Sequence, residues 1–231
     1  AVVSRGLGDV YKRQQYNYLL ARENLTDHLE KKDKINKIRQ RLLKIRAKRV
    51  ILATGALERP MVFNNNDRPG IMLSSAIKKY SDFYGVACGR KIVFFTNNDS
   101  AYESALSLND KGIKVEAVVD IRKQSETNLE KRVIDAGVKI YWEHTVVDTS
   151  GYKRLNNVSI MKLSNDGTSV TGNKISISCD CLGVAGGWTP AVHLYTQSGN
   201  KLTFDEDKKI FIPNKNNSDQ ISVGSCCGDF K

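Results

Sequence analysis

The stretch KIVFFTNNDSAYESALSLNDKGIKVEAVVD, residues Lys91–Asp120, gives the clearest indication of how this chain folds. It opens with the apolar run Ile92–Phe95, which is too short for a helix and rich in β-branched and aromatic residues, so it predicts a buried strand. Ala101–Leu108 has apolar residues at helical spacing, Gly112 follows where a helix would stop, and Val115–Val119 predicts a second buried strand. This is a βαβ unit, and strands that are apolar throughout indicate a parallel sheet covered on both faces.

The turn between the first strand and the helix lacks the glycines of a dinucleotide fold. Such a fold places G-x-G-x-x-G here, so that the backbone reaches a pyrophosphate at the helix N-terminus. This chain has TNNDSA at Thr96–Ala101, in which Asn97, Asn98 and Asp99 suit a turn and a helix N-cap, and Asp99 adds negative charge where an anion would bind. Asp120 occupies the place of a ribose-binding acid. We interpret the stretch as a Rossmann-like unit that does not hold a dinucleotide in the standard way.

Similar elements are predicted on both sides of this unit. Upstream, Ile71–Tyr84 shows helical spacing through Ile77, Tyr80 and Tyr84. Downstream, a helix is predicted with Ser125 or Thr127 as its N-cap and with Leu129, Val133 and Ile134 buried. A strand at Val138–Trp142 extends the unit to βαβαβ. The spacing of the apolar residues then changes to the pattern of an antiparallel meander, which precedes a last parallel strand at Cys181–Ala185. The predicted strands of the meander are Thr145–Thr149, Asn157–Leu163 and Lys174–Ser178.

Three other segments combine a strand with glycine. Two of them share one pattern, a buried strand followed by a small-residue turn and a proline: VILATGALERP at Val50–Pro60 and CLGVAGGWTP at Cys181–Pro190. This weak internal repeat suggests two related nucleotide-binding halves. ISVGSCCGDF, Ile221–Phe230, is a further pattern suited to backbone approach, and we expect it to return to the sheet of the first half. Before these, Arg41–Arg46 and Lys48–Thr54 predict two strands that are neighbours in a sheet.

Composition excludes several classes of protein. The net charge of +11 is concentrated in Lys31–Arg49, which is Lys-rich and has no interleaved aromatic residues, so we expect a solvated connection and no nucleic-acid partner. No apolar run is long enough to span a bilayer, and no membrane partner is predicted. The five cysteines make no C-x-x-C pair and the histidines have no metal-ligand spacing, so no metal site is predicted. Reduced thiols, with Cys179 and Cys181 facing the same side of a strand, indicate a cytoplasmic protein.

Taken together, these segments resemble the flavoproteins with two dinucleotide folds, the glutathione- and thioredoxin-reductase-like group. More narrowly, the chain resembles the α subunit of heterotetrameric sarcosine oxidase from about Gln15 to its end, and it covers only an interior portion of such a subunit. The NNDRPG loop and TNNDSA are the specific parts. The segments that carry the resemblance are VILATGALERPMVFNNNDRPGIML from Val50, KIVFFTNNDSAYESAL from Lys91 and CLGVAGGWTPAVHLYTQSGNKL from Cys181.

The resemblance implies a complex with beta, gamma and delta subunits that oxidatively demethylates sarcosine to glycine, giving formaldehyde or a folate adduct and hydrogen peroxide. It implies NAD in the first fold of the complete α subunit, and flavin (FAD or FMN) elsewhere in the complex or at a subunit interface. No catalytic residue falls within this chain, which is expected to be inactive alone. The cofactor-binding residues that carry over are Thr54, Gly55, Gly224, Ser225, Gly228 and Phe230.

The expected fold is α/β, a Rossmann-like parallel sheet with an inserted antiparallel β-meander, incomplete at the N-terminus. Residues 1–14 match nothing that follows and are interpreted as a non-native junction. Residues 15–70 are assigned to the C-terminal part of a first dinucleotide-binding domain, 71–190 to a second, degenerate Rossmann-like domain, and 191–231 to a return segment. Two alternatives stay open: an NAD(P)/FAD-dependent reductase-like subunit of another amine or opine oxidase, and a non-catalytic Rossmann scaffold.

Overall fold

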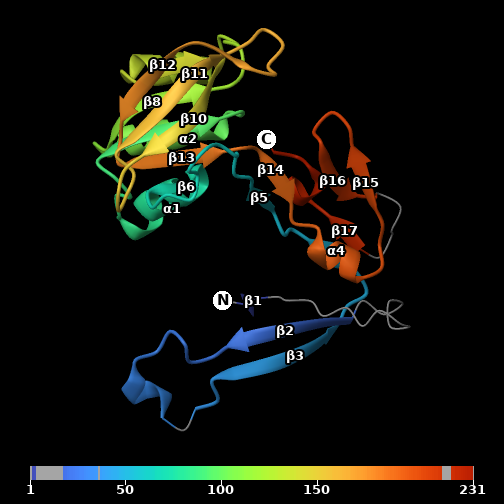
Figure 1. Cartoon of the computed structure of the whole chain (residues 1–231). Coiled ribbons are helices and arrows are strands. Elements are labelled where there is room, and N and C mark those ends of the chain that lie inside the picture. The colour runs from blue at the N-terminus through green and yellow to red at the C-terminus, as the bar shows by residue number, and fades with distance from the viewer. Residues whose placement is uncertain (1, 4–17, 36, 215–219, 231) are drawn as a thin grey trace. The chain divides into compact units, whose positions relative to one another are not determined.

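The computed structural model describes residues 2–3, 18–35, 37–214 and 220–230. The chain forms two compact units, which we call unit 1 (Ala1–Leu57 with Trp188–Lys231) and unit 2 (Glu58–Gly187) (Figure 1). Unit 2 therefore begins earlier than residue 71. The reason is that the loop before β6 packs with unit 2: the Phe63 ring meets the Phe95 ring edge-on, with centroids 5.8 Å apart, and Arg68 donates to the carbonyl of Gly151.

Unit 2 is built on a sheet of five parallel strands, in the order β6-β13-β7-β8-β9. The order confirms the predicted βαβαβ unit and places the last strand, β13, beside the first strand of that unit, β7. Both are buried along most or all of their length. The strands are β6 (Ile71–Leu73), β7 (Lys91–Thr96), β8 (Lys114–Asp120), β9 (Lys139–Trp142) and β13 (Cys181–Ala185).

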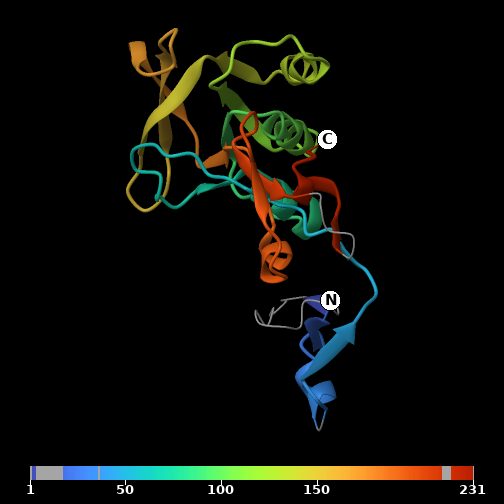
Figure 2. The same ribbon diagram turned by 90° about the vertical axis from the view of Figure 1, so that its right-hand side faces the viewer.

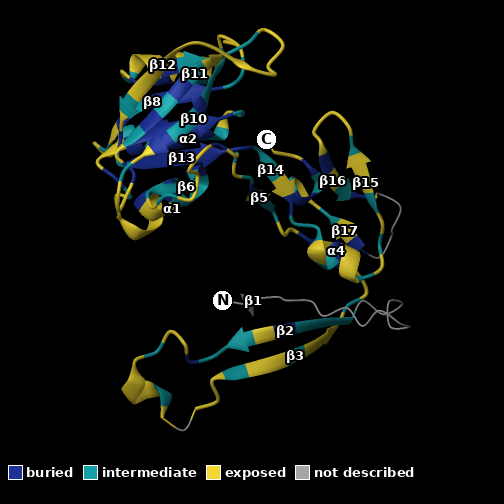
Figure 3. Ribbon diagram, viewed as in Figure 1, coloured by how far each residue is buried: buried dark blue, intermediate teal, exposed yellow. Residues whose placement is uncertain are grey.

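Helices cover one face of this sheet and a meander covers the other (Figure 2). The alternation of β7 explains the three layers: Ile92 and Phe94 pack in the helix-side core with Tyr102, whereas Val93 and Phe95 pack in the meander-side core. Figure 3 shows this sheet as the most deeply buried part of the unit. The helices are α1 (Ser74–Tyr84), α2 (Ser100–Asn109) and α3 (Asn128–Asp135), and the meander strands are β10 (His144–Ser150), β11 (Asn157–Leu163) and β12 (Val170–Ser178).

Some details of unit 2 differ from the sequence-based expectations. Ile71–Leu73, expected at the start of a helix, forms β6, because these residues complete the sheet edge beside β13. Tyr80 and Tyr84 continue the helical spacing of Ile77 but are 44% and 58% exposed, because the buried face of α1 runs through Ser74, Ile77 and Ser81. Ile134 is likewise exposed, whereas Val133 is buried.

Unit 1 consists of short paired segments. A hairpin of β2 (Tyr18–Asn24) and β3 (Gln40–Arg46), with η2 (Lys31–Lys34) between them, also pairs with β1 (Val2–Val3). The first strand of VILATGALERP, β4 (Val50–Leu52), pairs in parallel with β17 (Gln220–Ser222). The prediction that the runs at Arg41–Arg46 and Lys48–Thr54 are sheet neighbours is therefore wrong, because β3 pairs with β2 and β4 pairs with β17.

Trp188–Lys231 supplies the rest of unit 1. The two segments with the repeated pattern, VILATGALERP and CLGVAGGWTP, are adjacent, because β5 (Ala56–Glu58) pairs with β14 (Trp188–Pro190). The remaining elements are α4 (His193–Gln197), the antiparallel pair β15 (Leu202–Asp205) and β16 (Ile210–Pro213), and the 3-10 turn η3 (Gly224–Cys227). Of the proposed junction 1–14, residues 1 and 4–14 lie outside the described residues, so that assignment stays a prediction. In the described part of the chain, no helix combines the length and apolarity of a membrane span.

Candidate functional site

Three of the predicted cofactor residues, Thr54, Gly55 and Gly224, follow β4 and β17 at one edge of this strand pair. The two strands run in parallel, with Ile221 opposite Ile51 and Ser222 opposite Leu52, so the chain leaves both at the same edge. Thr54 and Gly55 follow β4, and Gly224 begins η3 just beyond β17. In α/β proteins, ligands bind at the carboxyl ends of parallel strands. The fold thus brings together two glycine turns that are far apart in the sequence.

Both glycines have backbone conformations that disfavour a side chain. Gly55 has a φ of 73° and Gly224 a φ of 71°, a region that glycine enters without steric cost. A Cβ built on either residue would have no neighbour within 4 Å among the described atoms. The space beside both backbones is open. The residues present therefore fit close approach of a cofactor to the main chain.

Hydrogen bonds within unit 1 hold this edge in place. The Val223 N–H donates to the Leu52 carbonyl at 2.9 Å, and the buried thiol of Cys226 lies 3.2 Å from the same oxygen. The Thr54 hydroxyl donates to the carbonyl of Ala191 at 2.6 Å. Because that proton is already used, Thr54 positions the turn and could offer a ligand only its oxygen lone pairs.

The other predicted residues have different surroundings. Ser225 belongs to η3 and is part-buried, and Phe230 is 40% exposed. Gly228 also has a positive φ, but its Cα packs against β16: a Cβ there would lie 3.0 Å from Cγ2 of Ile212. Close packing is thus sufficient to explain a glycine at position 228.

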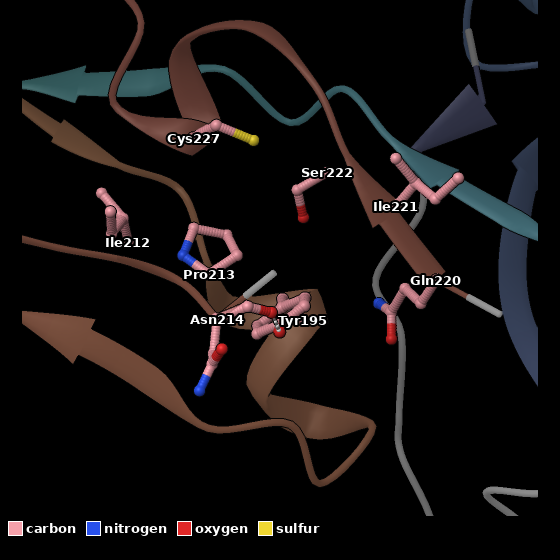
Figure 4. A pocket seen from close by; sticks show the side chains of 8 residues that line it. All are labelled: Tyr195, Ile212, Pro213, Asn214, Gln220, Ile221, Ser222 and Cys227. Carbon is pink, nitrogen blue, oxygen red and sulfur yellow. Dashed lines mark hydrogen bonds between the residues drawn. The ribbon is translucent and has the colours of Figure 1, made fainter. Parts of the chain in front are cut away.

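A small cavity lies near β17 (Figure 4). Its volume is about 230 Å³, below the range of roughly 300–1,000 Å³ that ligand pockets occupy. Its wall is tied together by a hydrogen bond from the Tyr195 hydroxyl to the Asn214 carbonyl. Sequence reasoning did not find it, since its residues come from separate short elements. They are Tyr195, Ile212, Pro213, Asn214, Gln220, Ile221, Ser222 and Cys227.

The corresponding edge of unit 2 is occupied by its own side chains. Asp120, expected in the position of a ribose-binding acid, is 1% exposed and accepts hydrogen bonds from the Tyr102 hydroxyl and the Arg122 guanidinium, both at 2.8 Å. Burial opposes the charge of Arg122, but its hydrogen bonds to Asp120 and Asp99 outweigh burial and raise its pKa. Burial, followed by the Asp120 charge, raises the pKa of Tyr102. These residues do not fit a bound dinucleotide.

The described residues offer no metal site, and two of the buried thiols have raised pKa values. No group of three or more His, Cys, Asp or Glu side chains is placed to hold a metal ion in the part of the chain that the structure describes. Cys88, Cys179, Cys181 and Cys226 are thiols that form no disulfide. Cys179 and Cys181 lie in opposite cores, contrary to expectation, because the chain bends at Asp180 between β12 and β13. Burial raises the pKa of each of these two thiols to about 12.

Comparison with known proteins identifies the family. The model of the pyridine nucleotide-disulphide oxidoreductase family matches residues 10–222, and the chain belongs to this family. Among its relatives is the sarcosine oxidase subunit alpha of Corynebacterium sp. (strain P-1), 39% identical over 216 residues, which are 93% of this chain and 22% of the relative. The subunit alpha of Rhizobium meliloti (strain 1021) is 36% identical over 75% of this chain and 16% of the relative. The chain therefore spans about a fifth of the length of such subunits.

Solved structures share the fold. The thioredoxin reductase of T. acidophilum aligns with a TM-score of 0.63 and 17% identity over 83% of this chain and 62% of that one. The L-proline dehydrogenase of P. horikoshii aligns with a TM-score of 0.59 and 21% identity over 97% of this chain and 36% of that one. The expected fold class is confirmed, and so is the resemblance to sarcosine oxidase α subunits.

Proposed function

We propose that this chain is part of the α subunit of a sarcosine-oxidase-like complex and that unit 1 contributes the backbone edge of an NAD site. The observation that carries the proposal is the meeting of Thr54-Gly55 with Gly224-Ser225 at the carboxyl ends of β4 and β17. Two positive-φ glycines with open space beside them suit a dinucleotide that approaches main chain. The 39% identity to a sarcosine oxidase subunit alpha supports the subunit assignment.

In this proposal the chain binds and orients, and the chemistry lies elsewhere. NAD, when bound, accepts or donates a hydride. The residues here would present N–H groups and Cα atoms to it, with the Thr54 hydroxyl holding the first turn to Ala191. The flavin-dependent oxidation of sarcosine to glycine would take place with the beta, gamma and delta subunits. Because the oxidation step lies outside this chain, we propose no catalytic residue and no metal ligand within it. We also propose that the complex is cytoplasmic.

The test compares three glycines of equal backbone conformation in the complete α subunit. Gly55, Gly224 and Gly112 have φ values of 73°, 71° and 72°, and a Cβ on each would meet nothing within 4 Å. Replacement by Ala should cost each about 1 kcal/mol of backbone strain. We expect Gly55→Ala and Gly224→Ala to lower the NAD retained after purification at least about tenfold, as loss of one close contact implies. Gly112→Ala, in unit 2, should retain NAD fully.

Equal NAD content in all three variants would remove the assignment to unit 1. The substrate is tested separately, by oxygen uptake of the assembled complex with sarcosine. Turnover of another secondary amine without turnover of sarcosine would favour a different amine or opine oxidase. A second candidate function, a non-catalytic scaffold, is favoured by the occupied edge of unit 2. A complete subunit that shows no saturable NAD binding would support the scaffold.

A further inference from the structure

The carboxyl edge of β7 and β8 in unit 2 is where a dinucleotide fold receives phosphate and ribose, yet its polar groups are already paired. The Ser100 N–H at the start of α2 donates to the side-chain oxygen of Asn98 at 3.1 Å. The Asn98 amide nitrogen in turn donates to the carbonyl of Ala185 at 3.0 Å, so this side chain also links the turn to β13. A phosphate at this helix end would have to displace the chain's own Asn98.

The chain also supplies its own anion at this helix end. Asp99 is the N-cap residue of α2, but its carboxylate makes no side-chain capping hydrogen bond. It accepts instead from the guanidinium of Arg122 at 2.8 Å. A carboxylate at this position is favoured by the helix dipole and by Arg122, and it would repel a phosphate. Asp99 is 54% exposed, so it forms the outer side of the cluster.

Arg122 joins Asp99 to the buried acid at the end of β8. Its main-chain N–H donates to Asp120 at 2.8 Å, and its guanidinium donates to both carboxylate oxygens of Asp120. The Tyr102 hydroxyl donates to one of the same oxygens. Asp120 is therefore saturated with donors from this chain and has no free acceptor for a ribose hydroxyl. The same guanidinium would otherwise suit the phosphate of a nucleotide, since it offers several donors in a planar fork.

We propose that Asp99, Arg122 and Asp120 form a clamp that closes the nucleotide edge of unit 2, and that Asp99 is its removable part. Without Asp99, Arg122 remains anchored to Asp120 and presents its outer donors to a nucleotide that carries a phosphate monoester, such as the ribose 2′-phosphate of NADPH. The inference concerns unit 2 alone and does not depend on NAD binding by unit 1.

The experiment measures NADPH binding to the 231-residue chain by calorimetry. The wild type should show no saturable binding to unit 2, whereas Asp99→Ser should show saturable binding, because it releases one charged hydrogen-bond donor of Arg122. Asp110→Ser, at the opposite end of α2, makes the same change in net charge and should behave as the wild type. Asp99→Asn, which removes the charge and keeps the side-chain size, is the second variant if Asp99→Ser fails to fold.

The same comparison in a Gly224→Ala background separates the two units. If the NADPH binding gained by removing Asp99 persists in the Gly224→Ala background, that binding belongs to unit 2 and supports the clamp. This holds whatever Gly224→Ala does to NAD retention. If the gained NADPH binding disappears in the Gly224→Ala background, the added binding lies in unit 1 and the clamp proposal is overturned. An Asp99 variant that binds NADPH no better than Asp110→Ser would also overturn it.

Discussion

At the scale of single residues, Glu58 carries a buried charge with incomplete hydrogen bonding. It is 8% exposed, and one carboxylate oxygen accepts from the Ser75 N–H at 2.8 Å near the start of α1. The other oxygen has no partner among the described residues. Burial raises the pKa of Glu58, against the lowering effect of the Ser75 hydrogen bond. The folded chain thus favours the protonated form of this side chain more than the unfolded chain does.

We expect Glu58→Gln to stabilise the chain at neutral pH. With its pKa raised on folding, Glu58 contributes stability below its unfolded pKa and loses that contribution as pH rises through the folded value. Glutamine keeps an acceptor for the Ser75 N–H and carries no charge. The melting temperature should therefore be higher for the variant at pH 7, and the difference should shrink towards pH 4. Glu103→Gln, at an exposed position, is the control. A lower melting temperature for Glu58→Gln at pH 7 would mean that the charged form stabilises this helix start.

At the scale of elements, two neighbouring helices begin in different ways. On α3, the Thr127 hydroxyl accepts from the Glu130 N–H at 3.2 Å and the Glu130 carboxylate accepts from the Thr127 N–H at 3.3 Å, which is a capping box. Ser125, the other cap candidate, donates its hydroxyl to the same carboxylate at 2.8 Å. On α2, the predicted N-cap Asp99 turns to Arg122, and Asn98 takes up the first N–H. The cap of α3 follows from its local sequence pattern, whereas the start of α2 also involves Arg122, which lies beyond the end of β8.

Thr127→Ala should lower the free energy of unfolding by about 1 kcal/mol, as loss of an N-cap generally does. Thr127→Ser keeps the capping oxygen and should stay within about 0.5 kcal/mol of the wild type. Urea titration of both variants, followed by circular dichroism, measures the difference. A serine variant as unstable as the alanine variant would show that the threonine methyl group, and not the cap, stabilises α3.

At the scale of the whole molecule, stability and charge are distributed unevenly. The sheet of unit 2 is buried on both faces, whereas Leu42 and Ile45 of the β2–β3 hairpin are exposed. Residues 18–49 carry eleven Lys and Arg against four Asp and Glu, a net charge of +7 out of the +11 of the chain. A two-stranded hairpin is marginally stable in water, and mutual repulsion of its charges weakens it further.

Hydrogen exchange should therefore separate the two regions. We expect the amides of β7 and β8 to exchange at least about a hundredfold more slowly than those of β2 and β3, because local opening of the hairpin exposes little apolar surface. Mass spectrometry of peptides after timed exchange measures this. Equal protection of the hairpin and the sheet would show that further contacts hold the hairpin.

The elements of unit 2 were predictable because their signals are local. The runs at Ile92–Phe95 and Val115–Val119 are confirmed as parallel strands, and Gly85, Gly112 and Gly137 each have a positive φ just after a helix. Strand pairing in unit 1 was not predictable in the same way, since β4 found β17 and not β3. Pairing depends on which edges meet after the chain has closed, and this information is not present in a short window of sequence.

The same distinction applies to the two nucleotide edges. The amino-acid sequence alone showed that the turn at Thr96–Ala101 lacks glycine and that Gly55 and Gly224 suit backbone approach, because these properties follow from residue type. The folded chain alone showed that Gly55 and Gly224 share one edge and that Arg122 fills the space between Asp99 and Asp120. Contacts of this kind join turns that follow different strands, and their energy exists only once packing has brought the strands together and excluded water.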